Sequence, residues 1–267
     1  MDHEVLPYEI WSEIVIFAAS FSMKQAATLT LVSHAFYDCV QPILYRTFIY
    51  YSQESGWPLQ SASLDWFQAK GTHIRTLFWG EGQQIGLLSS ILEVCTGLES
   101  LSVWVYVLNT DIDISALRPS LSKLQLRHLS INVFCLLGIN RFGPSEAQDP
   151  IFQSITHLDI INKEGPLDWE ALMGLKHLPR LTHVCLQYNI NPNAIDGVLR
   201  YCENVQVVIV VQPFPGEFPS DHRLVMHDLR TTGEWRESTF GEEDVWQRAE
   251  DIIAERRDLK KGTEPSD

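Results

Sequence analysis

The chain has 267 residues, of which 45% are hydrophobic and 20% charged, the composition of a folded protein of one or two domains. Its formal net charge of −14 argues against a nucleic-acid binder, because such proteins need a basic surface to displace counterions. No run approaches the 18 apolar residues of a membrane helix, and the acidic N-terminus lacks the order of a signal peptide. We therefore expect a cytoplasmic or nuclear protein, or one found in both places, that binds no membrane.

The cysteines point to a reducing compartment. They are five in number, an odd count, and none forms a C-x-x-C pair. Most have apolar neighbours, so we interpret them as small buried thiols. They are Cys39, Cys95, Cys135, Cys185 and Cys202.

Residues 5–45 have the pattern of a small module of three short helices. The first helix follows Pro7 and carries apolar residues at helical spacing. Residues 26–32 form a second apolar stretch, and Ser33 is a candidate N-cap for a third helix that Pro42 ends. A module of this size buries little of its own surface, so we expect it to lean on the rest of the chain, on a partner, or on both.

Residues 47–51 are rich in β-branched and aromatic side chains and predict a strand that forms the first rung of a stack. After it, one apolar phrase of the form L-x-x-L-x-L returns six times. The central positions 77, 101, 129, 158, 184 and 208 are separated by 24, 28, 29, 26 and 24 residues. Such a step is one strand plus one helix, so the units must stack to share a core. The pattern predicts an α/β, right-handed leucine-rich-repeat solenoid with a parallel sheet on the concave side and helices outside.

Helical patterns separate most of these phrases, but residues 138–153 have few apolar residues and predict a loop at the edge of the stack. Near the C-terminus, Leu224–Met226 could form one more strand. Residues 242–260 predict a capping helix that covers the last open edge. The predicted organisation is a helical module in residues 1–46, a solenoid in 47–230, and the capping helix with a frayed tail in 231–267.

Strand alternation sorts the repeat positions into two faces. The eighteen residues of the six phrases point inward and form one continuous core, and the residues between them line the concave face. Phe78 and Trp104 are candidate hot spots for a protein partner, unless the edge loop or a neighbouring rung covers them. The predicted partner face comprises Thr76, Phe78, Ser102, Trp104, His128, Ser130, His157, Asp159, His183, Cys185 and Gln187.

Three histidines occupy the same position in consecutive rungs: His128, His157 and His183. Stacked imidazoles could bind a divalent metal or sense pH. The alternative is that a polar side chain recurs because the repeats descend from one another.

The sequence contains no phosphate-binding loop, dinucleotide-binding turn, nucleophile elbow or zinc-binding helix motif. We therefore expect no enzyme: no catalytic residue, no cofactor and no metal site.

The N-terminal module resembles an F-box. Its opening Leu6-Pro7-x-Glu9-Ile10 and the later Leu31-Val32-Ser33-x-x-Phe36 match that family's two most specific segments. An F-box followed by repeats with a recurring Thr-His-[Leu/Val] phrase resembles the F-box/leucine-rich-repeat proteins expanded in fungi.

The resemblance implies an adaptor of an SCF-type ubiquitin ligase, active in ubiquitin-dependent protein degradation. The F-box would bind a SKP-type linker protein and through it a cullin, and the repeats would bind an unknown protein substrate. The carried-over positions would be divided between the core of the module and the linker interface. They are Leu6, Pro7, Ile10, Ile14, Leu31, Val32 and Phe36.

Two other functions stay open. His34 stands where the F-box pattern has a basic residue, and residues 18–25 differ from the helix start that is usual there. These departures favour a ligase-independent protein-binding scaffold with a degenerate F-box. Alternating strands and helices are also typical of an enzyme with a Rossmann-like sheet, although the short period and the missing phosphate loop argue against one.

Overall fold

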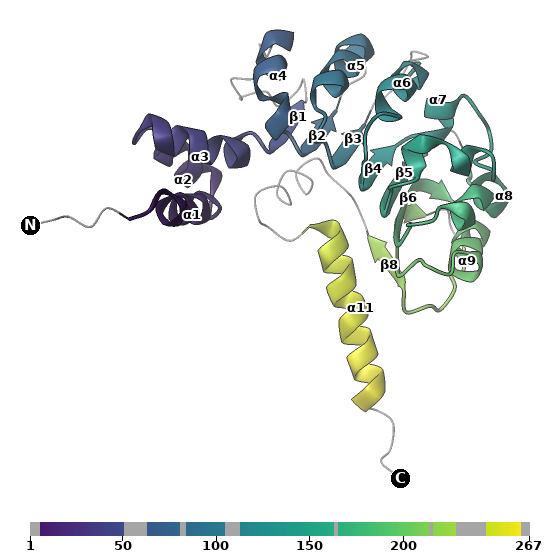
Figure 1. Ribbon diagram of the computed structural model, residues 1–267. Helices are drawn as coiled ribbons and strands as arrows, with labels where there is room; N and C mark the ends of the chain where they lie inside the picture. Colours follow the sequence, from purple (N-terminus) through teal and green to yellow (C-terminus); the bar gives the residue numbers. More distant parts are fainter. Residues whose placement is uncertain are drawn as a thin grey trace, which may run out of the picture.

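The computed structural model describes residues 6–50, 63–80, 84–104, 113–162, 165–213, 216–227 and 244–262. It is an α/β protein with one open, parallel sheet of eight strands (Figure 1). The strands follow each other across the sheet in chain order, and the helices between them lie on the convex side. The strands are β1 (Thr47–Tyr50), β2 (Thr76–Trp79), β3 (Ser100–Val103), β4 (His128–Ile131), β5 (His157–Ile161), β6 (His183–Ile190), β7 (Val207–Pro213) and β8 (Leu224–His227).

The register of the sheet confirms the repeat. The central residues of the six phrases pair with one another from β2 to β7, Leu77 with Leu101 at one end and Val184 with Val208 at the other. The predicted first rung is β1, where Phe48 pairs with Leu77, and the predicted additional strand is β8, where Leu224 pairs with Val208. All eighteen inward residues are at most 2% exposed, so they form the single spine that the pattern predicts.

The connections on the convex side are short helices, because each unit has room for only two or three turns before the next strand begins. They are α4 (Leu64–Lys70), η2 (Gly71–His73), α5 (Ile85–Val94), η4 (Ser115–Leu117), α6 (Arg118–Leu121), α7 (Val133–Leu137), η5 (Glu146–Gln148), η6 (Pro150–Phe152), α8 (Trp169–Leu172), η7 (Met173–His177) and α9 (Pro192–Tyr201).

The prediction of a loop in residues 138–153 was wrong. The segment forms η5 and η6, and its Phe142, Ala147, Ile151 and Phe152 are buried in the main core. Four well-placed apolar side chains are enough to fill the convex side of one unit, although their spacing matches no helical period.

The N-terminal module consists of α1 (Tyr8–Ala19), α2 (Met23–Leu29) and α3 (His34–Leu44) around a small core of Val15, Ala19, Ala26 and Val40. Ser33 caps α3 as predicted, because its hydroxyl accepts a hydrogen bond from the Phe36 N–H. Pro42 does not end α3, which runs on to Leu44. Because Pro42 lies in the last turn, few helical hydrogen bonds follow it and the kink costs little.

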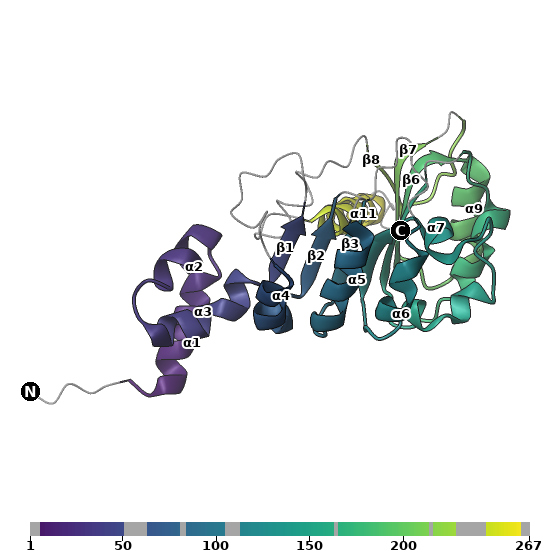
Figure 2. The ribbon, with the colours of Figure 1, turned by 90° about the horizontal axis from the view of Figure 1, so that it is seen from above.

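The module leans on the first unit of the sheet, as the small size of its core predicts (Figure 2). Lys70 of α4 donates hydrogen bonds to Gln41 and Tyr37 of α3. The ring of Tyr45 packs against the edge of Trp66 at 5.7 Å between centroids. The module and the repeats are therefore joined by side-chain contacts as well as by the chain.

The last helix, α11 (Val245–Gly262), is present, but its position corrects the prediction. Its apolar side lies on the concave face of the sheet, where it packs on β7 and on the edge strand β8, and it does not lie along the open edge of β8 (Figure 1). Only Arg256 reaches the carbonyl of Leu224 in the last strand. The concave side chains of the last strands are Val207, Ile209, Val211 and Val225. Covering this apolar strip removes more apolar surface from water than covering the short edge of β8 would.

The strand order also bears on the Rossmann-like alternative. A doubly wound sheet reverses its strand order at a switch point, and its ligand binds there. The order from β1 to β8 has no reversal, so this sheet has no such crevice. In the part of the chain that the structure describes, no helix is both long and apolar enough to cross a bilayer.

We predict that the inward spine carries the stability of the sheet. Leu158→Ala should lower the free energy of unfolding by about 2–5 kcal/mol, since Leu158 is fully buried in the middle of the sheet. Urea unfolding followed by tryptophan fluorescence measures the change. Met226→Ala, at an exposed site on β8, is the control and should change stability by less than about 0.5 kcal/mol. Equal effects of the two substitutions would contradict a shared spine.

Candidate functional site

The most unusual surface of the protein is apolar and belongs to the N-terminal module. Among the described residues, eleven large hydrophobic side chains are exposed, and nine of them lie between residues 6 and 32. Soluble proteins rarely gather so much exposed apolar area without a partner for it. The nine are Leu6, Tyr8, Ile10, Ile14, Ile16, Phe17, Phe21, Leu31 and Val32.

Helix α1 carries two apolar stripes. Trp11, Val15 and Ala19 recur every four residues and face the core of the module. Positions 10, 14 and 17 fall within about 60° of one another around the helix axis, away from that core, and Phe21 follows just after the end of the helix. We call Ile10, Ile14, Phe17 and Phe21 the α1 stripe. Phe17 is 65% exposed and contacts the edge of the Phe21 ring at 4.9 Å between centroids, so the two rings cover each other only in part.

A second exposed group is the α2–α3 turn pair, Leu31 and Val32. Leu31 is 85% exposed, the largest exposure of any of the nine residues. The backbone of the turn is fixed to the end of α2, because the Leu31 and Val32 N–H groups donate to the carbonyls of Thr28 and Leu29. The pair is therefore held outward by the backbone and gains nothing from packing within the chain.

Six of the seven residues carried over for linker binding are exposed: Leu6, Pro7, Ile10, Ile14, Leu31 and Val32. Phe36 is half-buried and stacks on Trp11 at 5.4 Å between centroids, so it belongs to the core of the module. Of the seven residues, Phe36 therefore belongs to the core of the module and the other six belong to its surface. The sequence reasoning did not select four further exposed apolar residues, Tyr8, Ile16, Phe17 and Phe21. The helical spacing of Phe17 after Ile10 and Ile14 was the available signal.

The predicted concave partner face is mostly closed, which corrects its use as an open surface. Phe78, Trp104, Ser102, Ser130, Asp159, His183, Cys185 and Gln187 are all buried. The ring of Phe78 contacts the edge of Trp104, and both pack with Ile161, so the candidate hot spot is an internal cluster. Only Thr76, His128 and His157 are partly exposed. Strand alternation places these side chains on the right face but cannot show what covers that face.

A chain of polar groups crosses the closed face. The Trp104 indole N–H donates to Ser130 Oγ at 2.8 Å, and the Ser130 hydroxyl donates to Asp159 Oδ2 at 2.6 Å. Gln187 Nε2 donates to Asp159 Oδ1 at 2.8 Å and to Oδ2 at 2.7 Å. Asp159 is 2% exposed, so these donors replace water around a buried carboxylate. The network ties the strands from β3 to β6 together.

The histidine column is real. The His128 and His157 rings lie 4.2 Å apart between centroids, and the His157 and His183 rings stack at 4.0 Å. The Nδ1 atoms of His157 and His183 are hydrogen-bonded to the hydroxyls of Thr156 and Thr182 at 2.9 and 2.8 Å. His183 Nε2 lies 2.9 Å from Glu250 Oε1 of α11. With stacked rings and engaged nitrogens, the column offers no converging ligand set.

Burial determines the protonation state of the three histidines in this column. Together with the neighbouring His128 and His183, it lowers the pKa of His157 to about 2. Burial also lowers the pKa of His128 and His183, against the carboxylates of Asp244 and Glu250 respectively. The three imidazoles are therefore neutral at pH 7.

The described residues contain no group of three or more histidine, cysteine, aspartate or glutamate side chains placed to hold a metal ion. Burial raises the pKa of the Cys95 and Cys202 thiols to about 12, so neither is a nucleophile at neutral pH. Asp113 caps the turn before η4 by accepting the Ser115 N–H.

No protein-family model matches the chain, and no curated protein matches its sequence.

We predict that the Asp159 network is a stability element of the closed face. Asp159→Asn should lower the free energy of unfolding by about 1–3 kcal/mol, because the amide nitrogen would face a donor from Ser130 or Gln187. Chemical denaturation measures the loss. Asp113→Asn, at a fully exposed carboxylate, should cost less than about 0.5 kcal/mol. An Asp159→Asn protein as stable as the wild type would show that the network contributes no net stability.

Proposed function

We propose that the chain is a substrate-recognition adaptor of an SCF-type ubiquitin ligase. In this proposal α1–α3 are an F-box that binds a SKP-type linker protein, and the strands with their outer helices are leucine-rich repeats that bind a substrate. The observation that carries the proposal is the exposed apolar surface of the N-terminal module, at the positions that the F-box resemblance assigns to linker binding.

The physical argument concerns desolvation. Leu6, Ile10 and Ile14 come from the start and first turns of α1, while Leu31 and Val32 come from the α2–α3 turn. Each apolar side chain that a partner buries contributes about 1.5–3 kcal/mol of hydrophobic free energy, before the entropy cost of association. Five such side chains are enough for a specific complex, and the small core of the module supplies no other use for them.

The order of the parts fits the role of an adaptor. The module sits at one end of the sheet, beside β1 and α4, and the repeats extend away from it (Figure 2). A substrate held on the repeats would be kept at a fixed distance from a partner held on the module. Such tethering raises the effective concentration of the substrate near a ubiquitin-charged enzyme, without any bond-making residue in the chain itself.

We predict that linker binding depends on the α1 stripe and the turn pair. Ile10→Asp combined with Val32→Asp should reduce recovery of a purified SKP-type linker protein by at least about tenfold, because two carboxylates would be desolvated in the interface. Co-purification at micromolar concentrations detects the loss of binding, and isothermal titration calorimetry measures the change in affinity.

The matched control is Ile16→Asp. Ile16 lies on the same helix and is 44% exposed against 46% for Ile10, but it points about 120° away from the α1 stripe. It should leave linker binding within about twofold of the wild type. Unchanged binding after the double substitution would reject this interface. A wild-type chain that binds no linker would favour the ligase-independent scaffold, for which His34 in place of a basic residue is the motivating observation.

A further inference from the structure

Helix α11 is attached to the concave face by few apolar contacts. Trp246, Ala249 and Ile253 are buried against the strip from β6, β7 and β8, and Val245 and Ile252 are only partly buried. Most other described side chains of the helix are exposed. The strip beneath it consists of Cys185, Val207, Ile209, Val211 and Val225. An element held by so little apolar area belongs to the part of a fold that opens most readily.

The N-terminal half of α11 rests on the histidine column. The Trp246 ring meets the His157 and His183 rings edge-on, at 5.2 and 5.7 Å between centroids. One turn later, Glu250 Oε1 accepts from His183 Nε2 at 2.9 Å. Asp244 caps the start of the helix by accepting from the Gln247 N–H at 3.2 Å. Docking of α11 therefore places an aromatic ring and two carboxylates over stacked imidazoles.

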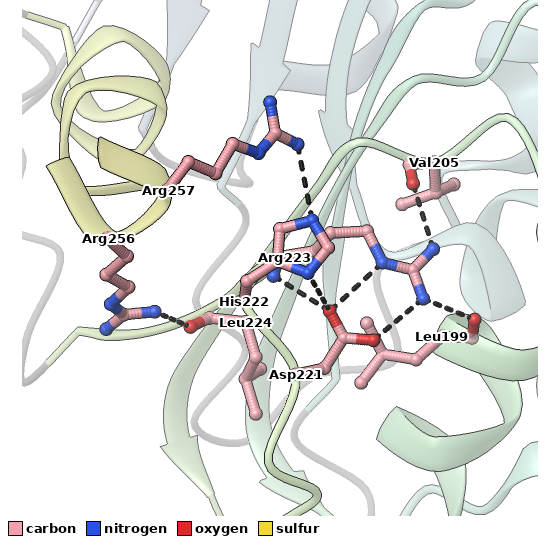
Figure 3. A network of polar contacts seen from close by, with 8 residues as sticks. All are labelled: Leu199, Val205, Asp221, His222, Arg223, Leu224, Arg256 and Arg257. Atoms are coloured by element: carbon pink, nitrogen blue, oxygen red, sulfur yellow. Dashed lines mark hydrogen bonds and ion pairs between the residues drawn. The ribbon is translucent and has the colours of Figure 1, made fainter. Parts of the chain in front are cut away.

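The C-terminal half of α11 is held by the turn at residues 221–224, which also contains a histidine, His222 (Figure 3). Arg223 fixes this turn, because its guanidinium donates to the carbonyls of Leu199 and Val205 and to the carboxylate of Asp221. Arg256 donates to the Leu224 carbonyl at 2.6 Å, and Arg257 Nη2 lies 3.3 Å from His222 Nε2. A guanidinium has only donors, so His222 can accept this bond only as a neutral imidazole.

Added protons oppose docking at the histidine column. The charged groups around the column are Glu99 and Arg127 on the side of the sheet, and Asp244 and Glu250 on the side of α11. Glu250 and Asp244 would tolerate a first proton on His183. A second proton would sit on an imidazole about 4 Å from a charged one, in a largely buried site.

We propose that α11 is a proton-controlled cover of the concave face, docked while the column His128, His157 and His183 holds at most one proton and released when the column takes up a second. Release uncovers the apolar strip on β6–β8. The proposal concerns the fold alone and holds whether or not the chain serves a ubiquitin ligase.

The direction of the effect follows from linkage. In the docked state, burial lowers the pKa of all three column histidines. When α11 leaves, the rings regain water and their pKa rises towards the ordinary value of about 6.5, so the released state binds more protons. Docking is thus unaffected well above about pH 6.5. Below it, the docked fraction falls by up to about tenfold per pH unit for each extra proton.

Cys185 supplies a native reporter of release, because it is fully buried in the strip under α11. Its labelling by a dipyridyl disulfide, a reagent that also reacts in acid, can be followed by peptide mass spectrometry in the full-length chain. Cys95 and Cys202 are buried in the main core and report global unfolding. From about pH 7.5 to 5.5, we expect labelling of Cys185 to rise about 10- to 100-fold relative to Cys95 and Cys202.

Variants assign the effect to the column and to the helix. Trp246→Ala should raise Cys185 labelling already at neutral pH, since it weakens docking directly. His157→Gln removes the middle imidazole and should move the onset of labelling to lower pH. Glu250→Gln removes the acceptor for the first proton and should move the onset to higher pH, while Glu255→Gln, at an exposed site on α11, should leave it unchanged.

Three results would overturn the proposal. Cys185 labelling that does not change with pH, or that rises only together with Cys95 and Cys202, would show that acid does not release α11 separately. An unchanged Cys185 in Trp246→Ala would show that α11 is not its cover. An onset that neither His157→Gln nor Glu250→Gln moves would place the titrating group outside the column.

Discussion

The fold depends on one constraint: equivalent inward side chains of successive units must meet in register across a parallel sheet. Leu101, Leu129 and Leu158 illustrate it, because each pairs with the next and each is almost completely buried. No single unit can bury its apolar side alone, so every strand gains its stability from both neighbours. The spine also fixes the opposite face, since strand alternation sends each intervening residue to the concave side.

That coupling explains why the functional surfaces lie where they do. The spine orders His128, His157 and His183 into a stack and brings Ser130, Asp159 and Gln187 into one network, which leaves the concave face closed. The N-terminal module does not share the core of the sheet. Its own core is small, and the α1 stripe and the α2–α3 turn pair stay exposed. In our account the module meets a partner, and the concave face opens only when α11 leaves.

The sequence predicted those features that follow from local period and alternation. These are the register of the six phrases, the extra strands β1 and β8, the cap at Ser33 and the histidine stack. It did not predict features that arise from distant contacts. Residues 142–152 fill the core without a helical period, and Trp246 and Glu250 meet histidines more than sixty residues earlier in the chain. Five of the nine exposed module residues were identified from local pattern, whereas the sequence left open whether Phe78 and Trp104 are covered, because their cover comes from other strands.

The central claim is the parallel register of the spine, and through-space contacts between labelled methyl groups test it most directly. In a methyl-labelled sample, nuclear Overhauser spectra should connect Leu77 with Leu101, Leu101 with Leu129 and Leu129 with Leu158, each residue with the next unit only. Contact of Ile131 with Ile160, beside that of Leu129 with Leu158, requires parallel strands, because an antiparallel pair would place Ile131 opposite Thr156. Contacts that skip a unit, or the absence of contact between Leu101 and Leu129, would contradict the shared spine and the account built on it.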